Sequence, residues 1–162
     1  ITASSTTPFV LGALEKAKEI GAITGLLLCN NPPKLEYVDY ITSIIVGPEV
    51  ITGSTRMKAG TATKMVLNMI TTTLMIKLNK TYGNLMVDLK ASNEKLWDRG
   101  TRIIQHLTDL SYDDSLKLLQ SADGEVKTAI VMEKLKMEAG DTRQKLNENK
   151  GSLRKVLDGE LS

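Results

Sequence analysis

The sequence is poor in several residue types, and each shortage excludes a class of protein or site. Cysteine and histidine occur once each, so the chain can form neither an intramolecular disulfide nor a structural zinc site. Aromatic residues make up only 4% of the chain, too few for the stacking platforms that bind single-stranded nucleic acid. The net charge is only +2, and polar residues interrupt each apolar run before it reaches membrane-spanning length. We therefore expect neither a nucleic-acid partner nor a membrane partner.

The remaining composition is typical of a globular protein of ordinary domain size. The 162 residues are 41% hydrophobic and 25% charged, which is enough apolar sequence for a core. A single cysteine favours a reducing, cytoplasmic compartment. The chain has no initiator Met, and Ile1–Ala3 is similar to the end of a strand, so we expect further sequence upstream.

The first part of the chain alternates between helical and strand patterns. A hydroxyl-rich turn precedes a predicted helix over residues 9–20, and short apolar runs predict strands at 23–29 and 40–46. The apolar run at 23–29 fits a strand of a parallel sheet that is covered on both faces. A long helix is predicted over 56–79, and because it is apolar nearly all round we expect it to be buried, in the core or at a subunit interface. This order predicts an α/β fold with helices flanking a parallel sheet.

The later part of the chain is a series of charged, amphipathic helices. Gly and Asp turns separate the predicted segments, which cover residues 93–108, 113–120, 126–138, 142–147 and 153–157. The short helices predict a small C-terminal helical bundle. We place the domain boundary near residue 110, so that residues 1–110 form the α/β domain and 111–162 the bundle.

Two loops carry residues that could bind an anion. Each loop follows a predicted strand and leads into a helix. In open parallel sheets, ligands bind just outside these carboxyl ends of the strands. The first contains Ser4, Ser5, Thr6 and Thr7. Their hydroxyl groups and the helix N-terminus suit a phosphate, but the same residues could simply cap the helix.

The second loop, residues 47–61, contains a carboxylate, several hydroxyl groups and two cations. Its candidate ligands are Glu49, Ser54, Thr55, Arg56 and Lys58. Cations in the first turn of a helix oppose the helix dipole, which indicates either a bound anion or an acidic partner such as Glu49. An ion-pair network that pins the loop is the alternative interpretation.

Three isolated residues have simpler interpretations. His106 lies in the middle of a charged helical segment, which is typical of a solvated or packed histidine and not of a catalytic base. Trp97 could mark an interface, but the edge of the core is the simpler interpretation. Cys29 follows an apolar strand and is expected to be buried.

These residues together resemble a known family. Residues 46–76, VGPEVITGSTRMKAGTATKMVLNMITTTLMI, closely resemble the signature of the N-acetylmuramic acid 6-phosphate etherases. These are sugar isomerase (SIS) domain proteins, to which the vertebrate glucokinase regulatory protein is related. Segments 1–22, 84–103 and 113–132 are similar to other parts of the family, so the resemblance covers practically the whole chain. The run GSTRMKAGTA is the specific part.

The resemblance implies a cytoplasmic lyase that acts on N-acetylmuramic acid 6-phosphate in cell-wall recycling. The family cleaves the D-lactyl ether to N-acetylglucosamine 6-phosphate and D-lactate, by elimination followed by addition of water, without a metal or cofactor. It acts as a homodimer with active sites near the subunit interface. Two glutamates serve as acid and base, and both lie upstream of the segment that Ile1 begins. We therefore expect no catalytic residue here, and we expect the C-terminal part of the SIS domain.

The first loop departs from the family pattern while the second does not. Ser5 and Thr6 stand where the family has Gly-Arg, which removes a bidentate cation and some backbone freedom. The resemblance still implies a phosphosugar site at Ser4, Ser5, Thr6, Thr7, Glu49, Ser54, Thr55, Arg56 and Lys58. The departure favours an alternative, a non-catalytic phosphosugar-binding regulator that resembles glucokinase regulatory protein. An isomerase of the same fold is a third possibility.

Overall fold

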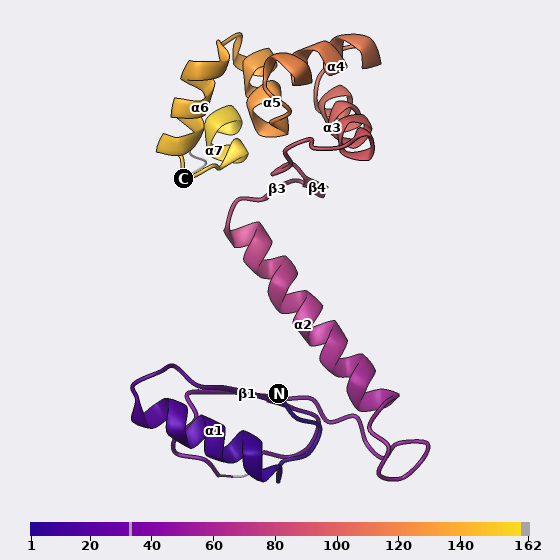
Figure 1. Ribbon diagram of the computed structural model, residues 1–162, viewed down its shortest axis with the longest axis vertical. Helices are drawn as coiled ribbons and strands as arrows, with labels where there is room; N and C mark the ends of the chain where they lie inside the picture. The colour runs from indigo at the N-terminus through magenta and orange to yellow at the C-terminus, as the bar shows by residue number, and fades with distance from the viewer. Residues whose placement is uncertain (33, 160–162) are drawn as a thin grey trace. The chain divides into compact units, whose positions relative to one another are not determined.

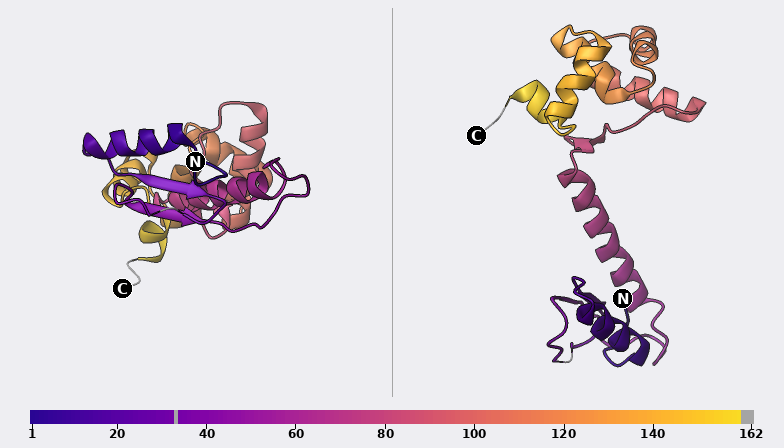
Figure 2. Two further views of the ribbon diagram at one scale, coloured as in Figure 1. Left: turned by 90° about the horizontal axis from the view of Figure 1, so that it is seen from below. Right: turned by 60° about the vertical axis from the view of Figure 1, so that its left-hand side comes forward.

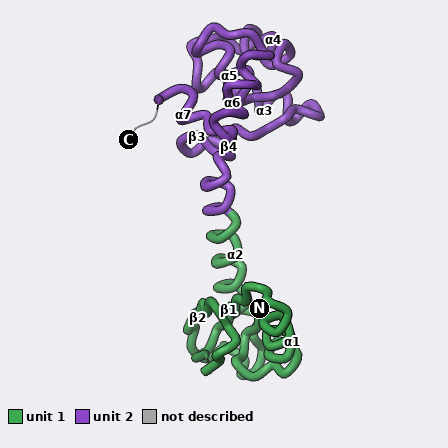
Figure 3. Tube along the Cα trace, turned by 90° about the vertical axis from the view of Figure 1, so that its left-hand side faces the viewer, with its two compact units in different colours: residues 1–71 green, residues 72–162 purple. Residues whose placement is uncertain are grey.

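The computed structural model describes residues 1–32 and 34–159, and the chain forms two compact units (Figures 1 and 3). Unit 1 comprises residues 1–71 and unit 2 begins at residue 72. The division falls within helix α2 (Lys58–Lys77), which therefore contributes residues to both units.

The compact units divide the chain at a different position from the predicted domain boundary near residue 110. Helix α3 (Glu94–Leu107) precedes that boundary, yet it packs against α4 (Tyr112–Ser121) and α5 (Val126–Leu135). The helices on either side of residue 110 thus share one core, because their apolar faces are buried against each other. The division into domains 1–110 and 111–162 stays a prediction.

Unit 1 is a small α/β layer. Strands β1 (Gly25–Leu28) and β2 (Tyr40–Ser43) pair in parallel, with Gly25 opposite Tyr40. Thr2 forms a parallel bridge to Leu28, which extends the pairing on the other side of β1. Helix α1 (Pro8–Glu19) lies along this strand pair (Figures 1 and 2). The prediction of an α/β fold with a parallel sheet and a helical C-terminal part is confirmed.

The core of unit 1 is thin. Its buried hydrophobic residues are few and come mainly from β1: Leu26, Leu27, Leu28, Cys29 and Ala59. Burial of β1 agrees with the expectation of a strand covered on both faces. All four residues of β2 are exposed, and α1 has no buried residue.

Helix α2 differs from the expectation in position and in burial. It begins at Lys58, two residues later than predicted, and Ala59 is its buried residue. Its exposed large apolar side chains are Met65, Leu67, Met69, Ile70, Leu74, Met75 and Ile76. Among the described residues, α2 is therefore not buried in a core. The other predicted location, a subunit interface, stays a prediction.

Unit 2 is a helical bundle preceded by a short hairpin that the sequence analysis did not predict. The hairpin pairs β3 (Thr81–Tyr82) with β4 (Leu85–Met86). Helices α3 to α5 are followed by α6 (Ala139–Glu148) and α7 (Leu153–Asp158), close to the predicted segments. Helix α5 ends three residues early, because Lys136 adopts a left-handed conformation with φ 53°. The buried core includes Ile104, Leu119, Val126, Ile130, Val131 and Leu153.

Helix α3 packs closely against its neighbours at Gly100. A Cβ atom built at this position would lie 2.9 Å from both Leu119 Cδ2 and Val126 Cγ2. Both neighbours are fully buried and have little room to move. Glycine at this position therefore lets α3 approach α4 and the start of α5.

Gly100→Ala is expected to lower the free energy of unfolding of unit 2 by about 1–3 kcal/mol, because the added methyl group overpacks the core. Chemical denaturation followed by circular dichroism measures the change. Gly140→Ala is the matched control: Gly140 is helical with no atom within 4 Å of the new Cβ, so this change should be neutral or slightly stabilising. Equal stability of the two variants would contradict the close packing.

Candidate functional site

Three hydroxyl groups meet in the loop that leads into α1. Thr7 Oγ1 lies 2.9 Å from Thr2 Oγ1 and 3.1 Å from Ser4 Oγ. Thr7 is the N-cap residue of α1, but its side chain makes no capping hydrogen bond. The interpretation that these hydroxyls serve only to cap the helix therefore fails at Thr7. In the first turn of α1 the N–H groups of Val10 and Leu11 donate to the Thr7 carbonyl oxygen, and the Phe9 N–H has no partner among the described residues.

Glu49 holds the second loop against the start of α2. Its Oε2 accepts a hydrogen bond from the Lys58 N–H and its Oε1 accepts one from the Ala59 N–H, each at 3.0 Å. These two backbone hydrogen bonds, that of Lys58 first, lower the pKa of Glu49 below its ordinary value. The carboxylate also matches the positive end of the helix dipole. Glu49 is thus a helix cap that joins two segments nine residues apart in sequence.

The two cations of this loop do not form the predicted ion pairs with Glu49. Lys58 Nζ donates to the carbonyl oxygen of Pro48 at 2.7 Å. Arg56 precedes the helix, and it makes no hydrogen bond or ion pair with any residue that the structure describes. The loop is therefore pinned by the bonds of Glu49 to backbone N–H groups and not by an ion-pair network. Arg56 keeps an exposed guanidinium for another partner.

A pocket of about 270 Å³ lies between the two loops in unit 1. Its lining comes from the first loop, the end of β1, the segment after β2 and the start of α2: Ala3, Ser4, Cys29, Asn30, Ile45, Val46, Gly47, Glu49, Thr55 and Ala59. Among the predicted ligands, Ser4, Glu49 and Thr55 are brought together here. The remaining predicted ligands do not line the pocket: Ser5, Thr6, Thr7, Ser54, Arg56 and Lys58.

Cys29 and Asn30 are the residues with polar side chains in the pocket wall that were not predicted as ligands. Cys29 is buried, as expected, and its Sγ lies 3.6 Å from the Ala59 carbonyl oxygen and 3.4 Å from Thr63 Oγ1. It therefore joins the end of β1 to α2. Asn30 Oδ1 accepts the N–H of Asn31, while its carboxamide N–H₂ has no partner among the described residues. The position of Asn30 directly after a strand could have identified it as a candidate.

The two isolated residues of unit 2 fit their simpler interpretations. Trp97 is partly buried and packs against the core, as predicted for the core edge. His106 is exposed in the last turn of α3. The described residues contain no group of three or more His, Cys, Asp or Glu side chains arranged to hold a metal ion.

Comparison with known proteins confirms the resemblance. The chain is similar to etherases over nearly its whole length. It is 51% identical to the N-acetylmuramic acid 6-phosphate etherase of Bacillus pumilus over 97% of the chain and 52% of that relative. The etherases of Vibrio campbellii and Bacillus subtilis are each 48% identical to it, over 98% of the chain and 52% of each relative. The chain thus spans about half the length of these relatives.

A family model matches part of unit 2. Residues 83–127 match the C-terminal lid domain of glucokinase regulatory protein. This match covers the segment from the β3–β4 turn to the start of α5. It agrees with the predicted relation to glucokinase regulatory protein.

Among the described residues, no helix combines the length and the apolar character that crossing a bilayer requires.

Glu49→Gln is expected to loosen the start of α2, because a carboxamide has only one acceptor oxygen for the two N–H groups. Hydrogen exchange at the Ala59 N–H should accelerate in the variant at neutral pH. Since the pKa of Glu49 is lowered in the folded state, its stabilising effect is present above its ordinary value of 4.5 and disappears as pH falls through the lowered value. The difference between wild type and variant, compared at equal pH, should therefore shrink in acid.

Glu15→Gln provides the control for this experiment. Glu15 is exposed on α1 and its side chain makes no hydrogen bond with a described residue, so its substitution should leave the Ala59 exchange rate unchanged. A Glu49→Gln variant with wild-type exchange throughout the pH range would show that the carboxylate does not hold this helix terminus.

Proposed function

We propose that this chain forms part of an N-acetylmuramic acid 6-phosphate etherase and that the pocket of unit 1 binds the phosphosugar. The lyase would release D-lactate and N-acetylglucosamine 6-phosphate by elimination followed by addition of water. One observation carries the proposal: Ser4 and Thr55, from two loops far apart in sequence, line the same pocket. The similarity to etherases along 97% of the chain supports the choice of substrate.

The loop chemistry suits a phosphate ester. Hydroxyl groups donate hydrogen bonds to phosphate oxygens without adding charge, and the Phe9 N–H in the first turn of α1 is a further donor without a partner among the described residues. The unpaired guanidinium of Arg56 supplies a cation in the adjacent loop. The proposed substrate ligands are Ser4, Ser5, Thr6, Thr7, Glu49, Ser54, Thr55, Arg56 and Lys58. Within this group Glu49 acts through the loop and helix that it joins, because its carboxylate oxygens already accept backbone hydrogen bonds.

Ether elimination requires a base for the proton beside the carbonyl and an acid for the leaving oxygen. We assign neither role to a residue of this chain. The contribution proposed for it is binding and orientation of the phosphosugar, in a cytoplasmic enzyme without a metal or cofactor.

We further propose that α2 lies at the interface of a homodimer. At 100° per residue, Leu67, Ile70 and Leu74 lie on one face of the helix. Met65, Met69 and Ile76 lie on the opposite face, and these six side chains are 38–57% exposed. A soluble helix with two apolar faces needs cover on both sides. One face suits the domain to which the helix belongs and the other suits a second subunit.

A second candidate function is supported by the match of residues 83–127 to a lid domain of a regulatory protein. A phosphosugar-binding regulator would use the same pocket without chemistry, and Ser5 and Thr6 in place of the family's Gly-Arg agree with it. D-lactate release, measured on the natural full-length protein that contains this chain, separates the two functions. Binding without release would favour the regulator.

Ser4→Ala is expected to weaken binding of N-acetylmuramic acid 6-phosphate about tenfold, because a hydrogen bond to the charged phosphate is lost. Isothermal titration calorimetry measures the change in Kd, with unphosphorylated N-acetylmuramic acid as the comparison ligand. Ser92→Ala, an exposed hydroxyl in unit 2, is the control and should bind normally. If both variants bind N-acetylmuramic acid 6-phosphate with equal affinity, Ser4 is not a ligand of the phosphate.

The dimer proposal is tested by charge on one face of α2. Replacing Ile70 and Leu74 together by lysine should raise the dimer dissociation constant at least about 100-fold, because unpaired charges would be buried. Analytical ultracentrifugation measures the dissociation constant. Asn68→Lys, a polar position of the same helix, should leave it nearly unchanged. Unaltered association of the double variant would exclude this face from the interface.

A further inference from the structure

A cleft of about 440 Å³ opens in unit 2, between the segment after β4, the start of α5 and helix α6. Four apolar residues contribute to its lining: Val87, Leu89, Val126 and Leu146. Charged residues complete it: Asp88, Lys90, Glu125, Lys127 and Arg143. Its volume lies within the range of small-molecule sites, which typically combine an apolar lining with a few placed polar groups.

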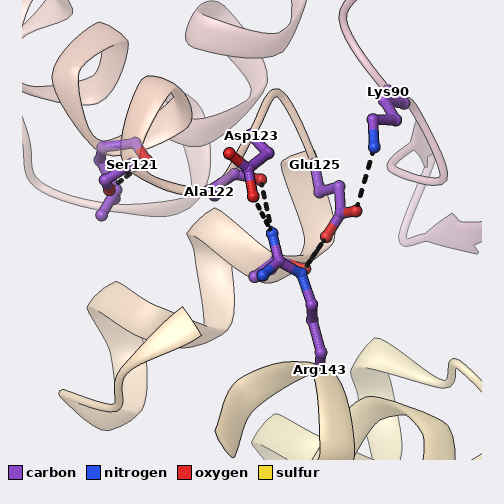
Figure 4. Close-up of polar contacts among 8 residues, drawn as sticks. Lys90, Ser121, Ala122, Asp123, Glu125 and Arg143 are labelled. Atoms are coloured by element: carbon purple, nitrogen blue, oxygen red, sulfur yellow. Dashed lines mark hydrogen bonds and ion pairs between the residues drawn. The ribbon is translucent and has the colours of Figure 1, made fainter. Parts of the chain in front are cut away.

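The guanidinium of Arg143 is held in a fixed orientation (Figure 4). Its Nε donates to Glu125 Oε2 at 2.8 Å, and its Nη2 donates to Asp123 Oδ2 at 2.6 Å. Its Nη1 has no hydrogen-bond partner among the described residues. Because two carboxylates fix the plane of the group, its positive charge is held in place beside Glu125 before any ligand arrives.

Lys90 is the second cation with unused donors. Its ammonium makes a single ion pair, 3.4 Å from Glu125 Oε1, and its side chain is 68% exposed. The backbone beneath it is firmly placed, since Ala91 N–H donates to the Gly124 carbonyl at 2.8 Å. An exposed ion pair of this length contributes little, so the ammonium can turn towards a ligand at small cost.

The carboxylates of the cleft are already paired. Asp88 binds Lys80 and Lys127, and Lys127 Nζ is in addition hydrogen bonded to the carbonyl oxygens of Asn79 and Gly151. Glu125 accepts hydrogen bonds from Thr128, Arg143 and Lys90. The carboxylates of the lining therefore already have donors, while Lys90 and Arg143 keep unused N–H groups. The three cations of the lining outnumber its two carboxylates, which leaves a net charge of +1. This balance favours an anion over a cation.

We propose that this cleft binds a small anion with an apolar body, a carboxylate or a phosphate monoester. The anionic group contacts Lys90 Nζ beside the ion pair of Glu125 with Arg143, and the apolar body contacts Val126 and Leu146. This binding is independent of the phosphosugar pocket of unit 1 and of its chemistry.

Hexanoate, hexyl phosphate and hexylammonium test the proposal with one apolar body and three head groups. Nuclear magnetic resonance titration of the ¹⁵N-labelled 162-residue chain is expected to show saturable shifts at the N–H groups of Lys90, Glu125 and Leu146 with at least one anion. The two anions distinguish a carboxylate ligand from a phosphate ester. Absence of saturable shifts with both anions, or equal binding of hexylammonium, would overturn the proposal.

Lys90→Met should raise the Kd of the bound anion about fivefold, as expected for loss of a partly exposed charge contact. Lys117→Met is the matched control, because Lys117 is 75% exposed and makes a single 3.4 Å ion pair with Asp114 on α4. The Lys117→Met variant should bind the anion with the wild-type Kd. A Lys90→Met variant that retains wild-type affinity and charge selectivity would also overturn the assignment.

Discussion

The hydrogen bonds between the Glu49 carboxylate and the first N–H groups of α2 are the interaction on which the site of unit 1 depends. They place the loop after β2 against the start of the helix, and the pocket lies where these two segments meet the hydroxyl-rich loop. A carboxylate is suited to this position because it satisfies two N–H groups at once and matches the helix dipole.

The two units differ in how far they bury their own apolar residues. Unit 2 has a continuous core of helices, with close packing at Gly100 and capping side chains at Asn93, Ser111 and Ser152. Unit 1 buries little beyond β1, and α2 exposes apolar side chains on opposite faces. Such an exposed surface is typical of a region that further protein covers. The similarity to relatives about twice as long as this chain agrees with that physical reading.

The two cavities present different chemistry to a ligand. The pocket of unit 1, for which a phosphosugar is proposed, offers neutral hydroxyl donors beside a carboxylate whose acceptors are occupied. The cleft of unit 2 offers two cations with spare donors beside an apolar lining. In both, carboxylates bind protein donors and thereby position neighbouring groups.

The sequence by itself determined the α/β order of unit 1, the helices of unit 2 and the two candidate loops, because turn residues and apolar spacing are local signals. The GSTRMKAGTA run and the hydroxyl-rich loop also carried the family resemblance. Only the tertiary structure decided that Glu49 binds backbone N–H groups and not the side-chain cations of Arg56 and Lys58. It also decided that Asn30 shares a pocket with Ser4 and Thr55. The charged cleft of unit 2 was likewise invisible, because Lys90, Glu125 and Arg143 come from three separate segments. Contacts between distant segments depend on how the chain folds back on itself, which spacing along the sequence does not specify.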